Sequence, residues 1–204
     1  GALNSSAAAA KVVYDAAVQA GAPKDCIQWI EQPSMQATDA LMNHSDVATL
    51  LATGGNAMVK SAYSCGKPAM GVGAGNVPAY VEKTADVKQA VHDIVMSKSF
   101  DNGMICASES AAIVDKEIYL EFINEMKTYH TYFVNKKEKA LLEEYCFGAK
   151  ANTKAALEAT LNPNIVGINA SVIAKEAGFN VPEHTAILAV EIDKVGPEEP
   201  MSRE

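Results

Sequence analysis

The sequence has no long apolar run and no cluster of positive charge. No part of its 204 residues approaches the roughly eighteen consecutive apolar residues of a membrane-spanning helix, and no basic segment followed by an apolar one opens the chain. The 17 basic residues are scattered and are outnumbered by 25 acidic ones, which gives a net charge of −8. This pattern indicates neither a membrane partner nor a nucleic-acid partner.

Cysteine is scarce and dispersed. The chain has four, Cys26, Cys65, Cys106 and Cys146, with no C-x-x-C pair and no cluster of cysteine and histidine. That spacing argues against zinc, iron-sulfur and disulfide frameworks, so we expect no bound metal and a reducing, cytoplasmic setting. Apolar residues make up 49% of the chain, which is typical of a globular protein with one or two cores.

The two ends of the sequence carry few signals of a complete protein. The chain opens at Gly1 without a methionine and stops at Glu204, straight after an acidic, proline-containing segment. We expect it to be a piece of a larger protein.

Apolar periodicity predicts alternating helices and strands. A helix capped by Asp86 has Val87, Val91 and Val95 on one face and leads to Phe100. Other helices are expected over residues 4–19, 34–42, 56–64, 116–128, 136–146 and 169–177, with strands over 27–30, 47–52, 69–72, 79–82, 111–114, 132–134 and 186–192. The order predicts an α/β fold with parallel strands, divided between 74 and 78 into domains 1–75 and 76–204.

Two glycine clusters follow strands in the first predicted domain. Thr53, Gly54 and Gly55 end one strand and open a helix, where free backbone N–H groups suit a pyrophosphate. The segment 71–75, G-V-G-A-G, leaves room for a flat ligand beside the main chain. Neither cluster is a G-x-G-x-x-G fingerprint. A ligand-free tight turn at the first and a bulge or close crossing at the second remain open.

Cys106 lies in a short polar loop between the amphipathic helix and an apolar strand. A buried structural cysteine is the commonest fate of a lone thiol. Gly103 gives this loop backbone freedom, and its polar flanks include Asp101 and Glu109, which favours a reactive thiol. No histidine is near in sequence, so a cysteine-histidine protease is not indicated.

Three motifs follow one another along the chain: A-T-G-G-N-A-M-V-K over residues 52–60, G-K-P-A-M-G-V-G-A-G-N-V-P over 66–78 and S-F-D-N-G-M-I-C-A-S-E over 99–109. In this order and spacing they resemble the aldehyde dehydrogenase superfamily, and within it most closely the CoA-acylating domain of bacterial bifunctional aldehyde-alcohol dehydrogenases. The likeness spans nearly the whole chain. It implies the later part of a Rossmann-like cofactor domain followed by the first part of an α/β catalytic domain.

The resemblance also implies roles for individual residues. By position, Cys106 matches the catalytic nucleophile. The cofactor pyrophosphate would face the turn of Thr53, Gly54, Gly55 and Met58, the nicotinamide would lie near Gly73, and Glu204 would hold the nicotinamide ribose. The implied cofactor is NAD. The oxyanion would be held by the Cys106 backbone N–H and by an asparagine outside this chain; Asn102 is not assigned that role.

One position departs from the hydrolytic members of the superfamily. Those enzymes carry a glutamate on the second glycine-rich segment that activates water, and the matching residue here is Val72. An aliphatic side chain accepts no proton, so the resemblance implies that the acyl group leaves on the thiol of coenzyme A. The expected reaction interconverts acetyl-CoA and NADH with acetaldehyde, NAD and CoA.

Alternatives stay open on the sequence alone. Another superfamily member would be a CoA-dependent semialdehyde dehydrogenase, or a hydrolytic enzyme with Glu82 or Glu109 as its base. The isolated chain is expected to be inactive, and a purely structural role within a larger assembly is the remaining reading. The resemblance further implies a homo-oligomer whose parent protein is fused to an iron-dependent alcohol dehydrogenase domain.

Overall fold

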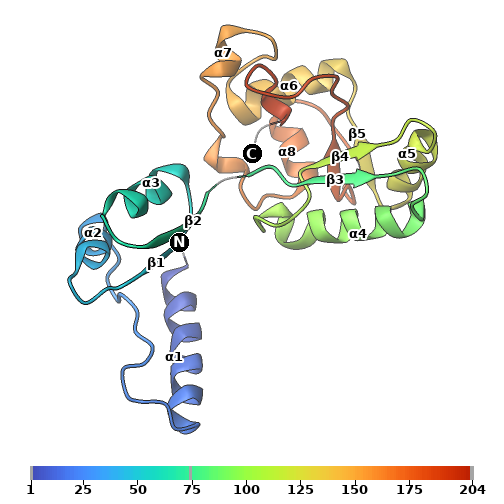
Figure 1. The fold of residues 1–204 in the computed structure, drawn as a ribbon. Coiled ribbons are helices and arrows are strands. Elements are labelled where there is room, and N and C mark those ends of the chain that lie inside the picture. The colour runs from blue at the N-terminus through green and yellow to red at the C-terminus, as the bar shows by residue number, and fades with distance from the viewer. Residues whose placement is uncertain (1, 74, 203–204) are drawn as a thin grey trace. The chain divides into compact units, whose positions relative to one another are not determined.

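The computed structural model describes residues 2–73 and 75–202, which form two compact units, residues 1–73 and 74–204. Within these ranges all three strand pairs are parallel, and helices alternate with strands along the chain (Figure 1). The predicted α/β fold with parallel strands is confirmed. No helix in the described ranges is both long enough and apolar enough to cross a membrane.

The first unit contains α1 (Leu3–Gln19), α2 (Met35–Asn43), β1 (Leu50–Thr53), α3 (Asn56–Ser64) and β2 (Ala69–Val72). Strand β1 pairs in parallel with β2, and α3 connects them (Figure 1). Met42, Ala52 and Ala62 form a small buried core. The opposite face of the strand pair leaves apolar side chains open, with Leu51 75% and Met70 62% exposed.

Two details of the first unit differ from the sequence-based expectation. Residues 27–30 form no strand, and Trp29 and Ile30 are exposed. Within residues 2–73, β1 and β2 pair only with each other, so this short apolar run has no neighbouring strand to supply its hydrogen bonds. Helix α1 begins at Leu3, one residue before the expected start at residue 4.

Helix α3 lies so close to β2 that Gly71 has no room for a side chain. A Cβ added to Gly71 would lie 2.5 Å from Cγ1 of Val59 and 2.9 Å from Cε2 of Tyr63. The Gly71 N–H also donates to the Tyr63 hydroxyl at 2.9 Å, which occupies the edge of β2 that β1 leaves free. The close contact therefore depends on glycine.

We expect Gly71→Ala to destabilise the chain by about 1–3 kcal/mol, because the added methyl overpacks the contact with α3. Gly75→Ala is a matched control, since a Cβ there meets nothing within 4 Å. The measurement is the urea midpoint followed by circular dichroism. Equal midpoints for the two variants would contradict the packing argument.

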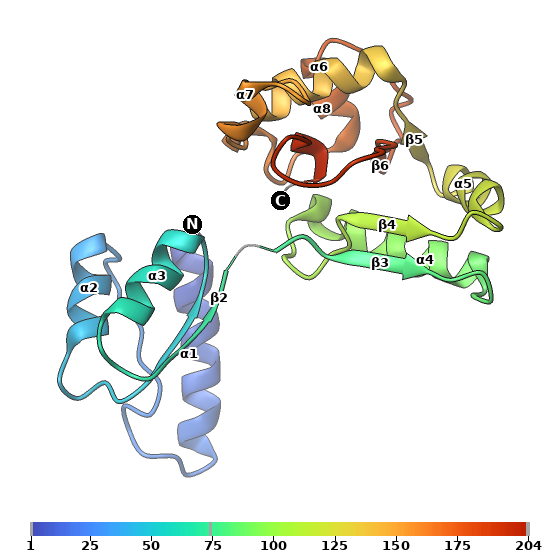
Figure 2. The same ribbon diagram turned by 45° about the horizontal axis from the view of Figure 1, so that its top comes forward.

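The second unit begins with β3 (Pro78–Val81), α4 (Val87–Ser99), the 3-10 turn η1 (Phe100–Gly103), β4 (Ala111–Val114) and α5 (Tyr119–Thr128). β3 pairs in parallel with β4, and α4 runs alongside the pair (Figures 1 and 2). The side chain of Asp86 caps α4 by accepting from the Gln89 N–H at 3.2 Å, as predicted. Helix α5 starts three residues later than expected, because residues 115–118 form a turn.

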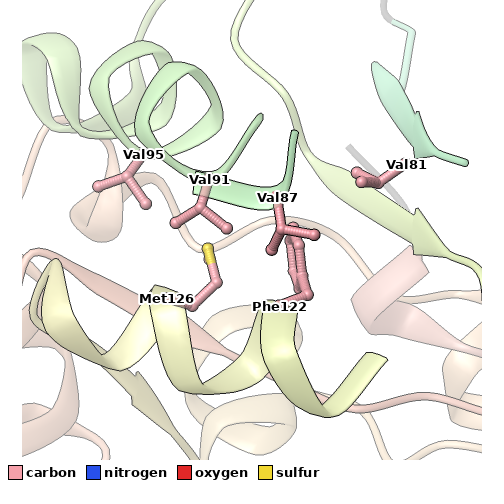
Figure 3. Close-up of a cluster of buried hydrophobic side chains, with 6 residues drawn as sticks. All are labelled: Val81, Val87, Val91, Val95, Phe122 and Met126. Atoms are coloured by element: carbon pink, nitrogen blue, oxygen red, sulfur yellow. The ribbon is translucent and has the colours of Figure 1, made fainter. Parts of the chain in front are cut away.

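The predicted valine stripe of α4 is buried. Figure 3 shows Val87, Val91 and Val95 directed toward Phe122 and Met126 of α5, with Val81 of β3 at one end of the cluster. Val91 is 0% exposed, and each fully buried valine contributes about 1.5–3 kcal/mol of transfer free energy. This core fixes the end of α4 from which the Cys106 loop departs.

The rest of the second unit comprises β5 (Thr131–Phe133), α6 (Lys136–Phe147), α7 (Lys154–Leu157), η2 (Pro163–Ile165), α8 (Ala170–Glu176), β6 (Ile187–Ala189) and η3 (Pro200–Ser202). β5 pairs in parallel with β6. Helices α6 and α8 lie side by side (Figure 2). Leu142 and Cys146 of α6 pack against Ala174 and Phe179 in a buried cluster. Asn135 and Glu138 form a capping box that starts α6, and left-handed Gly148 ends it.

Candidate active site

Cys106 is exposed, at the tip of a turn between η1 and β4. The backbone N–H of Ser108 donates to the Ile105 carbonyl at 3.0 Å, and the Ser108 hydroxyl donates to the same oxygen at 2.8 Å. Ser108 is 3% exposed, so these two bonds fix the base of the turn while its tip faces outward. The sequence alone left a buried structural cysteine open, and the structure is inconsistent with it at this position.

A left-handed backbone segment reverses the chain before the thiol. Asp101, Asn102 and Gly103 have φ values of 50°, 52° and 76°. Asp and Asn tolerate this region better than other residues with a Cβ, although each still costs free energy there. A Cβ on Gly103 would lie 3.2 Å from the Lys98 carbonyl oxygen. Glycine therefore suits this position both because of its positive φ and because it has no Cβ to crowd that oxygen. The contacts that hold this segment must offset its conformational cost.

Gly167 supplies those contacts from a distant part of the sequence. The Asn102 side-chain amide donates to the Gly167 carbonyl at 2.9 Å. A Cβ on Gly167 would lie 2.6 Å from Sδ of Met104, so the loop rests directly on this residue. Sequence reasoning assigned Gly167 no role, because it lies 65 residues from Asn102 and no local pattern connects the two.

The other cysteines have different environments. Cys146 is 6% exposed, and burial raises the pKa of its thiol to about 11. The Cys65 thiol donates to the Ala62 carbonyl at 3.0 Å, and Cys26 is exposed. Of these three, Cys146 is a packing residue, and it carries no thiolate near neutral pH.

We expect iodoacetamide at pH 8 to label Cys106 and to leave Cys146 unmodified. With a pKa of about 11, roughly one Cys146 side chain in a thousand is a thiolate at that pH, and its sulfur is also shielded. Peptide mass spectrometry measures the extent of labelling at each cysteine. Labelling in urea is the control that makes both accessible, and equal native rates at the two thiols would contradict the assignment.

The first unit gathers the other predicted site residues at one end of its strand pair. Thr53 ends β1 opposite Val72, and the Gly54 N–H donates to the Val72 carbonyl at 3.1 Å. The Met58 and Val59 N–H groups both donate to the Gly55 carbonyl, at 2.9 and 3.2 Å, and Gly55 provides no side-chain cap for the N–H groups of Asn56 and Ala57 at the start of α3. A dinucleotide pyrophosphate fits such a turn, both by its N–H groups and by the positive end of the helix.

Two glycines at this end of the strand pair, Gly54 and Gly73, have neighbours too close for a side chain. A Cβ on Gly54 would lie 2.9 Å from Sδ of Met58, and one on Gly73 would lie 2.8 Å from Oδ1 of Asn56. The residues predicted at the cofactor are therefore brought together, with Asn56 added to them. Glu204 lies outside the described residues, and Cys106 lies in the other unit.

One of the two alternative bases, Glu82, lies away from the thiol loop. Glu82 accepts from the Thr84 N–H at 2.8 Å and follows the end of β3, whereas the thiol loop precedes the start of the parallel strand β4. The two features therefore lie at opposite ends of that strand pair. Oε2 of Glu109 is buried and has no hydrogen-bond partner within residues 75–202. Val72 is 57% exposed at the end of β2.

The chain belongs to a class of α/β proteins that have two features: a glycine turn between a strand and a helix, here β1 and α3, and an exposed thiol, here Cys106. Over the residues that the structure describes, no three side chains of histidine, cysteine, aspartate or glutamate are grouped to hold a metal. A sequence model of the aldehyde dehydrogenase family matches residues 3–160, and the chain belongs to that family.

Curated relatives include aldehyde-alcohol dehydrogenases, among them proteins from Streptococcus pneumoniae and Escherichia coli. The protein from Streptococcus pneumoniae is 70% identical over 203 residues, which cover 100% of this chain and 23% of that protein. The bifunctional AdhE of Escherichia coli K12 is 46% identical over 196 residues, covering 96% of this chain and 21% of that protein. The chain thus spans about a quarter of the length of these relatives.

Solved structures of aldehyde dehydrogenases are also similar to this chain. An acetylating aldehyde dehydrogenase from Geobacillus thermoglucosidasius is 43% identical with a TM-score of 0.86, covering 98% of this chain and 42% of that one. A propionaldehyde dehydrogenase from Rhodopseudomonas palustris, solved with bound CoA and an acylated cysteine, is 30% identical with a TM-score of 0.76, covering 93% and 41%.

Proposed function

We propose that this chain carries the cofactor turn and the nucleophile of a CoA-acylating aldehyde dehydrogenase. The reaction interconverts acetyl-CoA and NADH with acetaldehyde, NAD and CoA. The observation that carries the proposal is the exposed Cys106 thiol on a loop braced by Gly167, in a chain with an aliphatic residue at position 72.

Cys106 performs the covalent chemistry. Its thiolate sulfur bonds to the aldehyde carbon, and the carbonyl electron pair moves to oxygen to give a thiohemiacetal oxyanion. The backbone N–H of Cys106 has no acceptor within residues 75–202 and is the proposed donor to that oxyanion. Bound NAD supplies the acceptor for the hydride that leaves this carbon as the carbon-oxygen double bond re-forms. The product on the protein is a thioester at Cys106.

Val72 directs the fate of that thioester. Because valine accepts no proton, water receives no help at this position, whereas the CoA thiolate attacks without a base and expels the Cys106 thiolate. The balance between two thioesters is close to even, which makes the reaction reversible. The propionaldehyde dehydrogenase from Rhodopseudomonas palustris, solved with bound CoA and an acylated cysteine, supports the same route.

The turn of Thr53, Gly54, Gly55 and Met58 is the proposed pyrophosphate site, with Gly73 near the nicotinamide and Glu204 at its ribose. The choice of NAD over NADP is also proposed. A related engineered glycolyl-CoA reductase was solved with bound NADP+, at 30% identity and a TM-score of 0.75, so both cofactors belong in the test.

The length of the relatives supports a larger parent. We place this chain within a homo-oligomeric, cytoplasmic aldehyde-alcohol dehydrogenase whose second module is an iron-dependent alcohol dehydrogenase.

The experiment uses that full-length protein: acetyl-CoA is added with NADH or NADPH, and cofactor oxidation, acetaldehyde and ethanol are measured. Formation of acetaldehyde, or of the ethanol that the second module would make from it, is expected and should require both acetyl-CoA and NADH. Oxidation of NADH that yields neither product, or no oxidation at all, would contradict the function.

A further inference from the structure

Asn56 lies between the two glycine segments of the first unit. It directly follows Gly55 as the first residue of α3, and its side chain reaches the end of β2. A Cβ on Gly73 would lie 2.8 Å from Oδ1 of Asn56 and 4.0 Å from its Cγ. Apart from the residues adjoining Gly73, no other atom of residues 2–73 comes within 4 Å of that position. Asn56 therefore fills the space that a side chain at position 73 would need.

The contact with Gly73 determines which way the amide of Asn56 points. Its Oδ1 and Cγ lie within 4 Å of the Cβ position on Gly73, whereas its Nδ2 lies farther away. The two N–H donors of the amide are therefore directed away from Gly73. The residue is exposed, and its side chain has no hydrogen-bond partner within residues 2–73. Both donors are open to a ligand at the turn.

The needs of helix α3 do not explain this side chain. Asn135 and Asn169 precede α6 and α8, and their side chains cap those helices by accepting from backbone N–H groups. Asn56 stands one position later, inside its helix, and caps nothing. The hydroxyls of Ser61 and Ser64 in the same helix each donate to a carbonyl one turn back. Asn56 differs from all four in that its polar atoms are left for a partner outside the helix.

We infer that Asn56 is a further cofactor-binding residue, whose side-chain amide donates to the pyrophosphate of the dinucleotide. The inference rests on the proposed function, which puts the pyrophosphate at the turn of residues 53–55 and the nicotinamide near Gly73. A cofactor that spans these two segments passes the side chain that lies between them. Hydrogen bonds from N–H groups to an anionic oxygen are strong, and a neutral amide supplies them without the cost of desolvating a second charge.

Asn56→Asp is the sharpest test, because it keeps the size of the side chain and replaces both donors with a negative charge. The full-length protein is assayed with acetyl-CoA and NADH after a chelator has removed the iron of the proposed second module. The KM for NADH is expected to rise about a hundredfold, and kcat to stay within about threefold. Asn56→Ala only removes the donors and is expected to raise this KM about tenfold. Asn56→Gln keeps an amide and is expected to lose less affinity than Asn56→Ala.

Ser64→Asp is the matched control for the added charge. Ser64 is the exposed last residue of α3, about 12 Å along the helix from Asn56. The KM for NADH of this variant is expected to stay within about twofold of the wild-type value, because the charge lies more than a Debye length from the proposed pyrophosphate site.

Hydrogen exchange of the full-length protein measures binding without turnover. NADH is expected to slow deuterium uptake in a wild-type peptide that spans residues 50–60, because the cofactor covers the N–H groups of the turn. Asn56→Asp is expected to show no slowing at the same NADH concentration. Since the effect is read in this peptide alone, cofactor bound to the second module does not contribute to it.

The outcomes separate the inference from the proposed function. An active wild type with an unchanged KM for NADH in Asn56→Asp, or with an equal rise in Ser64→Asp, overturns the inference alone. A wild type that does not oxidise NADH with acetyl-CoA refutes the proposed function. If Asn56→Asp does not fold, Asn56→Ala decides the question, and a KM for NADH equal to that of the wild type then overturns the inference.

Discussion

Cys106→Ala is expected to lower acetyl-CoA-dependent NADH oxidation by the full-length protein at least about a thousandfold. Without the sulfur no thioester forms, and the residual rate reflects binding and oxyanion stabilisation only. The measurement is kcat with saturating acetyl-CoA and NADH. Cofactor affinity, measured by fluorescence titration, is expected to stay unchanged, because the glycine turn lies in the other unit.

Cys26→Ala is the matched control for this variant. Cys26 is also exposed, yet it lies between α1 and α2 of the first unit and has no part in the proposed chemistry. Its activity is expected to equal that of the wild type. Undiminished activity in Cys106→Ala would refute the nucleophile assignment, and an equal loss in both variants would point to damage unrelated to the thiol.

Gly167→Ala is expected to lower kcat, by up to about a hundredfold where the thiol loop moves with Met104. The added Cβ would lie 2.6 Å from Sδ of Met104, so this side chain must shift, and Cys106 is two residues further along. A displacement of about 1 Å at a nucleophile costs on the order of 100-fold in rate. The measurement is kcat for acetyl-CoA reduction, with the Cys106 alkylation rate as a second indication of a moved thiol.

Gly178→Ala separates this displacement from backbone strain. Both glycines have left-handed φ values, +73° at Gly167 and +97° at Gly178, but a Cβ on Gly178 meets nothing within 4 Å. Both variants therefore carry a similar conformational cost, and Gly167→Ala alone carries the clash. Equal kcat values for the two would show that Gly167 does not position the thiol loop.

Local sequence signals were sufficient wherever an element's own residues determine it. The valine spacing of α4 predicted the face that packs on Phe122 and Met126, and the run from Ala69 to Val72 matched β2. Asp86, Asn169 and Gly178 marked helix ends correctly. The exposed thiol loop followed from its polar flanks. In each case the deciding interaction lies within a few residues of the signal.

The sequence did not indicate which residues contact partners far away along the chain. An apolar run such as 27–30 becomes a strand only if a neighbouring strand pairs with it, and the run itself does not reveal whether one exists. Gly167 matters through a partner 65 residues away, Asn102, and nothing in its local sequence marks it. Short helix α7 was also missed, since four residues give no period.

The central claim is that the acyl group on Cys106 leaves on CoA and not on water. The most direct test uses the full-length protein after a chelator has removed the iron of the proposed second module, so that this module does not reduce acetaldehyde with the NADH formed. The protein is mixed rapidly with acetaldehyde and NAD in the absence of CoA, and NADH is followed by absorbance. We expect a burst of about one NADH per Cys106, then near arrest, because the thioester forms but Val72 activates no water. Adding CoA is expected to start steady turnover. Sustained NADH formation without CoA, at the rate seen with it, would contradict the account.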